Sequence, residues 1–439
     1  MEFTENIISG MSYLFNAQKN DGGIAIADPT NAQSGIWTTA ECLEAILSSH
    51  YLGLDISAYD KILKMVEFLT NHFQYCEQTN DMGYWEDTAG DRLPVIIAGH
   101  VIYSLNFFKN KILNNTNINS VNIEKTQYLF DNIRNKIDLE TNAAIKWLLN
   151  NQQDDNGWSF TAKKNEKKSE IFCVYYVLKA FKSRGSTSLN DPNINNACIF
   201  IKKAITEIIN KTQYSETDLP NVLHGYCGLI LSGYFKKSDV SFKEEILKYI
   251  KQKWKEIDKN TYVNMQNLNF LQIPYIFNMP YIALDTLMVA EEYTFKKQIN
   301  ILAKKYANSQ TACGAWKIRK NDNDESTWVT AEAIIILGRI EQQFFDYQNK
   351  VSLPQKMKKY EVANFLFSMI TAVLLLVISS SMFSVNFESL EKSHIFVILS
   401  QFKIFQIITF IIGFISLISS LITIIDFFKK GYPKYIVPL

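Results

Sequence analysis

The densest group of charged and aromatic side chains in this 439-residue chain lies in one short stretch: Asp81, Trp85, Glu86, Asp87, Asp91 and Arg92. The chemistry open to this group is electrostatic, but binding of a diphosphate would need more basic partners than Arg92 alone. Opposite charges at this density favour a solvated loop with local ion pairs. A second acidic run, residues 322–325, precedes a predicted helix, and with Ser326 it is typical of a helix cap.

Composition excludes several classes of protein. Six cysteines are scattered without a C-x-x-C pair, which argues against a disulfide framework and fits a reducing compartment. The net charge of +1 indicates no nucleic-acid partner. Residues 1–5 lack a basic region followed by an apolar run, so no secretory signal is visible. Hydrophobic residues make up 47% of the chain, enough for a large core.

Four segments repeat one pattern. A glutamine is followed by an acidic residue or its replacement three positions later, a small residue at five and usually an aromatic residue at six: Gln18–Ile24, Gln78–Tyr84, Gln152–Trp158 and Gln310–Trp316. The long interval before the last segment leaves room for two more units with degenerate turns, which predicts six repeats. We expect the glutamine to cap a helix end and stack on the aromatic ring, a structural role rather than a catalytic one.

Each unit is predicted to consist of an amphipathic outer helix and a mostly apolar inner helix. The outer helices are expected at residues 5–17, 60–75, 138–151, 191–210, 241–257 and 295–308, and the inner helices at 36–47, 93–108, 169–182, 220–235, 280–293 and 326–342. Residues 109–136 are predicted to be an insertion or a long solvated helix-loop. Six such pairs close into an all-α (α/α)6 toroid, in which every unit has a neighbour on both sides.

The Q-x-x-D-x-G-W turns resemble the QW repeats of squalene and oxidosqualene cyclases. Residues 5–343 as a whole resemble the prenyltransferase/squalene-cyclase superfamily. Trp328–Ala333 is similar to the family's S-T-W-x-T-A-x-A-L helix start, and Trp37–Leu43 repeats it in the first unit. The resemblance implies a ring whose inner helices begin around a central cavity.

Transferred to this chain, the resemblance implies a set of ligand-binding residues at the cavity mouth: Trp37, Glu41, Arg92, His100, Cys173, His224, Tyr226, Tyr281, Asp285, Trp328 and Glu332, with Glu170 and Cys227 beside them. Ring closure would make the first and last repeats neighbours and bring Trp37 close to Trp328. These tryptophans and the tyrosines suit an apolar ligand or a cation. For each glutamate, a capping or supporting role is the simpler interpretation.

The two reactions implied by the family depend on motifs that this chain lacks. Class II cyclases protonate an alkene with the middle aspartate of a D-x-D-D segment, and none occurs here. Prenyltransferase β-subunits bind zinc through an aspartate, a cysteine two residues later and a distant histidine, but Ile171 and Gly225 precede Cys173 and Cys227 at that spacing. A zinc site of Cys173 with His224 is an alternative to packing of both cysteines as small apolar side chains. No catalytic residue, metal or cofactor is assigned.

After residue 345 the composition changes. Ala363–Phe383 and Ile404–Ile425 carry no charge, and the first would span about 31 Å as a helix, which matches a bilayer core. Lysines flank both outer ends, which predicts a two-span protein with the toroid and both termini in the cytoplasm. Two buried core helices are the alternative. The predicted organisation is a toroid at 1–345, a basic linker at 346–362, a transmembrane hairpin at 363–428 and a basic tail at 429–439.

Two functions follow from these expectations. The first is a membrane-anchored, catalytically degenerate cyclase-like toroid that binds a ligand or acts as a sensor for the hairpin, as in bacterial anti-phage effectors. Its expected partners are the lipid bilayer, a small lipophilic ligand or a protein segment, and further copies of the chain through the serine-rich spans. The alternative is a membrane-bound isoprenoid-acting enzyme of the terpene-cyclase or prenyltransferase type. A buried carboxylate with carboxylate neighbours would weaken the first hypothesis.

Overall fold

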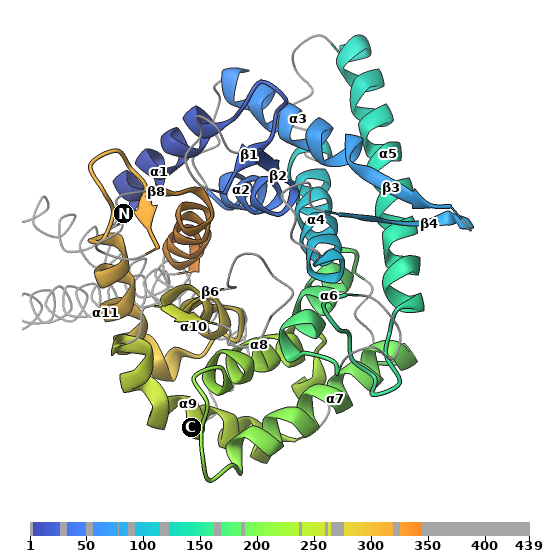
Figure 1. Ribbon diagram of the computed structural model, residues 1–439. Helices are drawn as coiled ribbons and strands as arrows, with labels where there is room; N and C mark the ends of the chain where they lie inside the picture. The colour runs from blue at the N-terminus through green and yellow to red at the C-terminus, as the bar shows by residue number, and fades with distance from the viewer. Residues whose placement is uncertain are drawn as a thin grey trace, which may run out of the picture. The chain divides into compact units, whose positions relative to one another are not determined.

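The computed structural model describes residues 3–26, 33–49, 56–77, 79–86, 93–114, 123–161, 168–185, 189–236, 239–259, 262–264, 276–318 and 325–343. The chain divides into one unit of residues 1–343 and a second of residues 344–439. The second unit, which contains the predicted linker, hairpin and basic tail, lies outside the described residues. The first unit is a ring of helices in two layers (Figure 1), so the mostly helical α/α toroid expected from the sequence is confirmed.

The inner layer consists of helices that are buried on nearly all sides: α2 (Ile36–Ser48), α4 (Pro94–Phe108), α6 (Ile171–Ser183), α8 (Asp218–Leu231), α10 (Met279–Val289) and the helix of residues 327–343. In α10, every residue from Met279 to Met288 is buried. Such a helix is stable only inside a layer, because its apolar side chains point in every direction. Successive inner helices therefore pack side by side, from α2 on α4 through to α8 on α10.

The outer layer consists of helices with one apolar face: α1 (Thr4–Ala17), α3 (Ile56–Asn71), α5 (Ile123–Asn150), α7 (Pro192–Ile209), α9 (Val240–Lys259) and α11 (Lys296–Ala307). In α7 the buried side chains recur every three or four residues from Ile194 to Ile208, and this stripe packs on α6 and α8. Asp191 caps α7 by accepting a hydrogen bond from the backbone N–H of Asn193 at 2.9 Å. α5 begins well before the expected residue 138, so part of the predicted insertion is helical.

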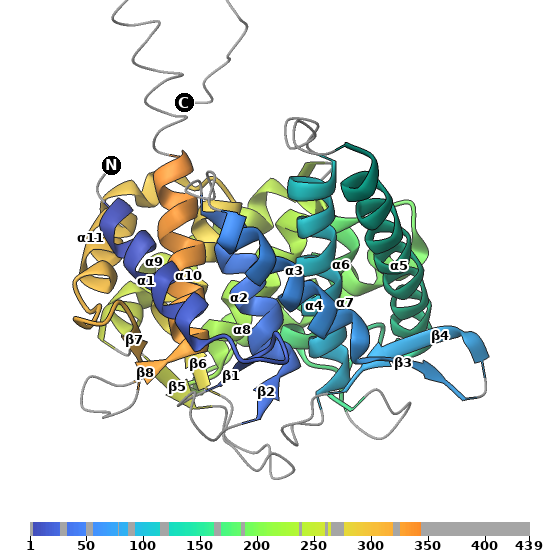
Figure 2. The same cartoon turned by 90° about the horizontal axis from the view of Figure 1, so that it is seen from above.

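Short antiparallel hairpins lie at one end of the helices (Figure 2): β1 (Ile24–Ala25) with β2 (Ser34–Gly35), β5 (Tyr262–Asn264) with β6 (Ile276–Asn278), and β7 (Trp316–Lys317) with β8 (Glu325–Ser326). The strands β2, β6 and β8 each lead directly into an inner helix, so these helices begin at the same end of the ring. Single turns η1 (Lys109–Leu113), η3 (Tyr234–Lys236) and η4 (Tyr293–Phe295) complete the described elements.

Three of the repeated glutamines link successive outer helices. Each donates from Nε2 to two carbonyl oxygens, one four residues later in its own turn and one near the start of the next outer helix. The acceptors are Gly22 (3.0 Å) and Lys61 (2.8 Å) for Gln18, Asn156 (2.9 Å) and Asn193 (3.1 Å) for Gln152, and Gly314 (2.7 Å) and Asn6 (2.9 Å) for Gln310. Because the last of these joins the end of α11 to α1, the same device that spaces the repeats also closes the ring.

The acidic residue of the turn connects the two layers. In the third turn, Asp155 accepts from the backbone N–H of Gly157 at 3.2 Å and from both the backbone N–H and the hydroxyl of Ser169, which precedes α6. Asp21 makes the equivalent contacts with Gly23 and Ser34. These carboxylates hold the loop that leads into the inner helix, so they are structural.

The second predicted turn, Gln78–Tyr84, is wrong. Residues 79–84 of this segment lie in β4 (Thr79–Trp85), which forms a hairpin with β3 (Phe73–Cys76) in which Gln74 pairs with Tyr84; Gln78 lies outside the described residues. In β3 the aromatic residues Phe73 and Tyr75 alternate with Gln74 and Cys76, and β4 ends in Tyr84 and Trp85, residue types that favour strands. Trp85 takes the position expected of Tyr84: its Nε1 donates to the carbonyl of Leu69 at 2.8 Å, as Trp158 and Trp316 do to Leu148 and Tyr306.

The first and last repeats are neighbours, as expected for a closed ring. The carboxylate of Glu341 accepts a hydrogen bond from the backbone N–H of Phe3 at 2.6 Å. The hydroxyl of Thr327 donates to the carbonyl of Ala25 at 2.5 Å. These contacts place the start of α2 beside the start of the helix of residues 327–343.

Replacing Gly314 with alanine is expected to lower the free energy of unfolding by about 2–5 kcal/mol. Its φ of +92° disfavours any side chain by about 1–2 kcal/mol, and the new Cβ would also press into the backbone carbonyl of Ser9 in α1. Gly185→Ala is the matched control, because Gly185 has a φ of +74° but open space around it. Urea denaturation of both variants measures the difference, and equal losses would show that the close approach of this turn to α1 contributes nothing.

Candidate functional site

The first and last inner helices begin in the same way. In each, a threonine hydroxyl donates to the carbonyl four residues earlier and accepts from the backbone N–H that follows the preceding turn. Thr39 donates to the carbonyl of Gly35 (2.7 Å) and accepts from the N–H of Ile24 (2.9 Å). Thr330 donates to the carbonyl of Ser326 (2.6 Å) and accepts from the N–H of Trp316 (2.9 Å). Glu41 and Glu332 follow these threonines by two residues, so the repeated W-x-T-A-E segment brings two carboxyl groups to matching positions.

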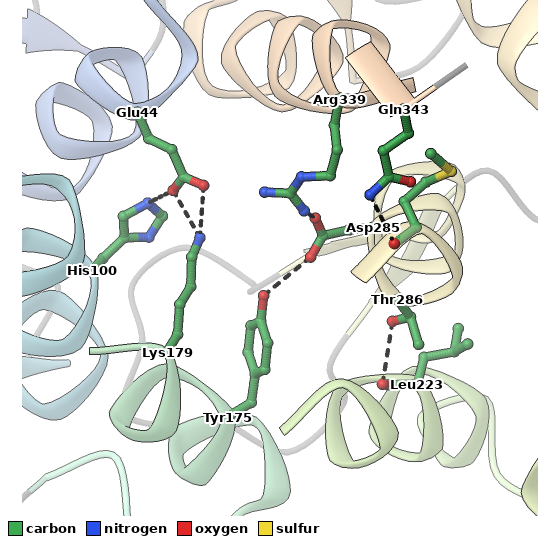
Figure 3. A network of polar contacts seen from close by, with 10 residues as sticks. Glu44, His100, Tyr175, Lys179, Leu223, Asp285, Thr286, Arg339 and Gln343 are labelled. Atoms are coloured by element: carbon green, nitrogen blue, oxygen red, sulfur yellow. Dashed lines mark hydrogen bonds and ion pairs between the residues drawn. The ribbon is translucent and has the colours of Figure 1, made fainter. Parts of the chain in front are cut away.

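A buried ion pair lies deeper along the ring axis (Figure 3). Nζ of Lys179 in α6 is 2.9 and 2.7 Å from the two carboxylate oxygens of Glu44 in α2, and it also lies 4.2 Å from the ring centroid of Tyr103. The side chain of Glu44 is completely buried. Burial by itself raises the pKa of Glu44, but the charge of Lys179 and the neighbouring His100 outweigh it and bring the pKa to about 2. Glu44 is therefore a carboxylate at any physiological pH.

His100 in α4 completes this pair. Its Nε2 lies 3.2 Å from Oε2 of Glu44, although the ring is not oriented for a well-formed hydrogen bond. Burial lowers the pKa of His100, and the charge of Lys179 adds to this, while Glu44 acts in the opposite direction. The imidazole is thus neutral at pH 7. It contacts the half-buried ring of Trp37 and stacks on Tyr176 with 5.3 Å between ring centroids.

A second ion pair joins the last two inner helices. Asp285 in α10 binds Nη1 of Arg339 and accepts a hydrogen bond from the hydroxyl of Tyr175 at 3.2 Å (Figure 3). Asp285 is 5% exposed, so its charge is balanced by Arg339 inside the ring rather than by water.

Glu41 and Glu332 are the carboxyl groups with raised pKa values. Burial, followed by the charge of Glu44, raises the pKa of Glu41 to about 8. Burial and then the charge of Glu41 raise the pKa of Glu332 well above its usual value of 4.5. Oε2 of Glu332 accepts a hydrogen bond from the Asn278 side chain at 2.6 Å. Glu41 is therefore mainly protonated at neutral pH, and the direction of the pKa shift favours the protonated form of Glu332 as well, whereas Glu44, one helical turn from Glu41, is ionised.

We refer to these groups as the central cluster: Glu41, Glu44, His100, Lys179, Asp285, Glu332 and Arg339. Protonated and ionised carboxyl groups side by side are the arrangement that acid–base enzymes use to donate a proton and stabilise positive charge in one site. Within the described ranges, no group of three or more histidine, cysteine, aspartate or glutamate side chains is arranged to hold a metal ion.

The structure brings several of the predicted site residues to this cluster and places others elsewhere. Glu41, His100, Asp285 and Glu332 belong to it, and Trp37 and Tyr281 lie beside it. His224 is enclosed by Phe172, Tyr175 and Phe277, and its Nδ1 lies 2.9 Å from the carbonyl of Pro220.

The remaining predicted residues are separate from the cluster or untested. Tyr226 donates to Glu292 at 2.7 Å on the side of α8 that packs on η3. Cys173 is buried and Trp328 is half-buried. Arg92 lies outside the described residues, as do Asp87 and Asp91 of the dense polar stretch.

Three members of the cluster were not predicted: Glu44, Lys179 and Arg339. The signal that could have found them is a charged residue inside an otherwise apolar inner helix, since such a residue is buried and must have a partner. Lys179, for example, lies within the apolar run of Ile171–Phe181.

Comparisons with known proteins identify no family for this chain. No protein-family model matches it, and no curated protein matches it. A GH76A α-1,6-mannanase from Salegentibacter sp. is similar in structure, with 8% identity, a TM-score of 0.48 and coverage of 76% of this chain and 98% of the mannanase. A glycoside hydrolase family 76 mannosidase from Bacteroides thetaiotaomicron shares 7% identity, with a TM-score of 0.49 and coverage of 78% and 100%. An α-amylase from Clostridium perfringens shares 12% identity, with a TM-score of 0.44 and coverage of 76% of this chain and 97% of the amylase.

These findings correct the family expected from the sequence. The similar structures are glycoside hydrolases, not prenyltransferases or squalene cyclases, and the predicted membership is wrong. The physical reason is the role of the QW-like turns. Their glutamines hydrogen-bond to backbone carbonyls of neighbouring outer helices, so they report how helical pairs are joined rather than what the ring does. At these identities the likeness concerns helical architecture alone.

The predicted function is wrong as well. A degenerate ligand-binding or sensor toroid was expected to lack a buried carboxylate with carboxylate neighbours, whereas Glu41 and Glu332 are buried, influence each other and lie near Glu44. The isoprenoid alternative depended on the same family assignment and is not retained.

The predicted two-span membrane location is also corrected. Among the described residues no helix is both long and apolar enough to cross a bilayer, because the long outer helices carry charged residues along their exposed faces. The predicted hairpin at 363–428 lies outside the described residues.

Proposed function

We propose that six helical pairs form an (α/α)6 ring whose centre is the active site of an enzyme that hydrolyses glycosidic bonds by general acid catalysis. Glu332 is the proton donor, and Asp285 is the carboxylate that stabilises the positive charge developing on the sugar. The observation that carries the proposal is the coexistence, in one buried cluster, of carboxyl groups with raised pKa values and a carboxylate, Asp285, that is paired with Arg339.

The chemistry of acetal cleavage matches this combination. A glycosidic C–O bond breaks readily when its leaving oxygen receives a proton as positive charge builds on the anomeric carbon. At neutral pH this needs a carboxyl group that is still protonated and a second one that is ionised. The C–O electron pair goes to the leaving oxygen with the proton of Glu332, water supplies the new hydroxyl, and the proton released from water passes to a carboxylate of the cluster.

Each member of the cluster has a defined task in this scheme. Asn278 donates to Oε2 of Glu332 at 2.6 Å and fixes the orientation of the acid. Arg339 binds Asp285 in an ion pair, and Tyr175 holds it by a hydrogen bond of 3.2 Å. Glu44 acts through its charge, which raises the pKa values of Glu41 and Glu332 and keeps both acids protonated.

Hydrolysis of a panel of chromogenic aryl glycosides by the purified full chain tests the proposal. We expect turnover of at least one glycoside by the wild type and a loss of about 100- to 10,000-fold in Glu332→Gln, because the amide cannot donate the required proton. Glu140→Gln is the matched control: Glu140 is a buried carboxyl whose pKa burial raises to about 8, but it lies on the outer helix α5. The proposal fails if the wild type cleaves nothing, or if the two variants are equally active.

A further inference from the structure

Both cationic side chains at the centre of the ring are already paired with a carboxylate. Four carboxyl groups (Glu41, Glu44, Asp285 and Glu332) meet two cationic side chains (Lys179 and Arg339) there. Lys179 directs its ammonium group at both oxygens of Glu44, and Arg339 is used by Asp285. In the part of the chain that the structure describes, no salt bridge joins Glu41 or Glu332 to a cation. His100 is neutral and adds no charge.

Glu41 has an unused hydrogen-bonding atom in this environment. The residue is 2% exposed, and its Oε2 is buried without a hydrogen-bond partner among the described residues. A buried carboxyl oxygen without a partner loses its interactions with water and gains none from the protein, which costs about 1–3 kcal/mol. A ligand atom that donates a hydrogen bond to Oε2 would remove this cost.

Aromatic rings lie around the same position. Trp37 comes one helical turn before Glu41 and is half-buried, and its ring meets that of Tyr176 edge-on with 5.9 Å between centroids. Burial raises the pKa of the Tyr281 phenol well above its usual value, and the charge of Glu44 and, to a smaller extent, that of Glu332 add to this. Carboxylates combined with aromatic faces are the surroundings in which proteins bind organic ammonium groups.

We propose that the centre of the ring binds a ligand with a protonated primary amine. Glu41, in its carboxylate form, accepts a hydrogen bond from this ammonium group through Oε2. The substrate class of the proposed hydrolase is then a glycan that contains free amino sugars. The amine-binding step stands on the geometry of Glu41, whereas the assignment to a glycan rests on the proposed function. On binding, Glu41 releases its proton to solvent, and the ammonium group balances the negative charge that Glu41 then carries. A neutral analogue offers no ammonium group, so it leaves Glu41 protonated and Oε2 without a charged partner.

Titration calorimetry with glucosamine and N-acetylglucosamine tests the inference on the full chain. We expect glucosamine to bind at least tenfold more tightly, with the preference growing from pH 6 to pH 8. Titrations in two buffers of different ionisation enthalpy are expected to show release of close to one proton per ligand at pH 6, because Glu41 must lose its proton. Glu41→Gln is expected to lose both the preference and the proton release, whereas Glu140→Gln keeps both.

Two results would overturn the inference: equal affinity for the two sugars in the wild type, or a preference for glucosamine that survives in Glu41→Gln. The melting temperatures of both variants show whether they are folded. Failure here is distinct from failure of the proposed function. Cleavage of neutral glycosides without an amine preference removes only the inference, and a Glu41-dependent amine preference without any hydrolysis removes only the proposed function.

Discussion

Replacing Lys179 with methionine is expected to lower the free energy of unfolding by about 3–5 kcal/mol at pH 7. Glu44 is completely buried, and both of its oxygens contact Nζ of Lys179, at 2.9 and 2.7 Å. The variant would leave this carboxylate inside the ring without its cation. Methionine retains most of the volume of lysine, so the loss arises mainly from the unpaired charge. Urea denaturation of wild type and variant measures it.

The double variant Glu44→Met/Lys179→Met is the control. A buried ion pair replaced by apolar residues of similar volume is often as stable as the original. We therefore expect the double variant to recover most of the stability that Lys179→Met loses. If it is no more stable than the single variant, the loss comes from packing of the lysine side chain over Tyr103 and not from the unpaired carboxylate.

The pH dependence of the same pair has a definite sign. The pKa of Glu44 falls from its usual 4.5 to about 2 on folding, so the unfolded chain binds the proton more readily than the folded one. Its contribution is fully present above pH 4.5 and is lost as the pH falls toward 2. At 1.36 kcal/mol per pKa unit the contribution is about 3 kcal/mol. Glu44→Met/Lys179→Met is expected to lack this acid-labile component.

Replacing Glu41 with glutamine is expected to stabilise the protein at neutral and alkaline pH while removing part of the proposed site. Burial and Glu44 raise the pKa of Glu41 from 4.5 to about 8 on folding. Its favourable contribution is therefore fully present below pH 4.5 and is lost as the pH rises through 8. Glutamine stays neutral throughout, so the variant avoids the loss. We expect a gain of about 3 kcal/mol at pH 7, increasing toward pH 9.

Denaturation of wild type and Glu41→Gln between pH 4 and pH 9 measures this gain. The two stability curves are expected to coincide near pH 4 and to separate steadily above it. Glu140→Gln serves as the comparison, because its pKa is also raised to about 8 by burial, but away from the central cluster. Parallel curves for wild type and Glu41→Gln would mean that Glu41 is ionised at neutral pH in the folded protein, contrary to the proposed site.

The two glutamates act in opposite pH ranges although they lie one helical turn apart in α2. Glu44 stabilises the fold above pH 4.5, and Glu41 destabilises it as the pH rises toward 8. The two pKa values differ because of where Lys179 lies. Its ammonium group hydrogen-bonds to Glu44 directly, whereas it acts on Glu41 only through its charge at a longer distance. A residue that weakens the fold at neutral pH is a signature of a site shaped for binding or catalysis.

Much of the ring follows from local features of the sequence. Apolar periodicity predicted most inner and outer helices, because helix amphipathicity depends only on the spacing of side chains along one segment. The turns at Gln18, Gln152 and Gln310 were visible for the same reason, since their hydrogen bonds lie partly within five residues. The turn at Gln78 was misassigned because the pairing of β3 with β4 decides that segment.

The central cluster was decided by the tertiary structure. Glu44 meets Lys179 across 135 positions of sequence, and Asp285 meets Arg339 across 54. Closure of the ring buries the carboxyl groups of the first and last repeats and brings them within reach of each other, and burial followed by the charge of Glu41 raises the pKa of Glu332. From the sequence alone, Glu41 and Glu332 are two residues of a repeated segment. Whether such a carboxyl is an acid or a carboxylate depends on burial and on which charges surround it, and only the closed ring determines both.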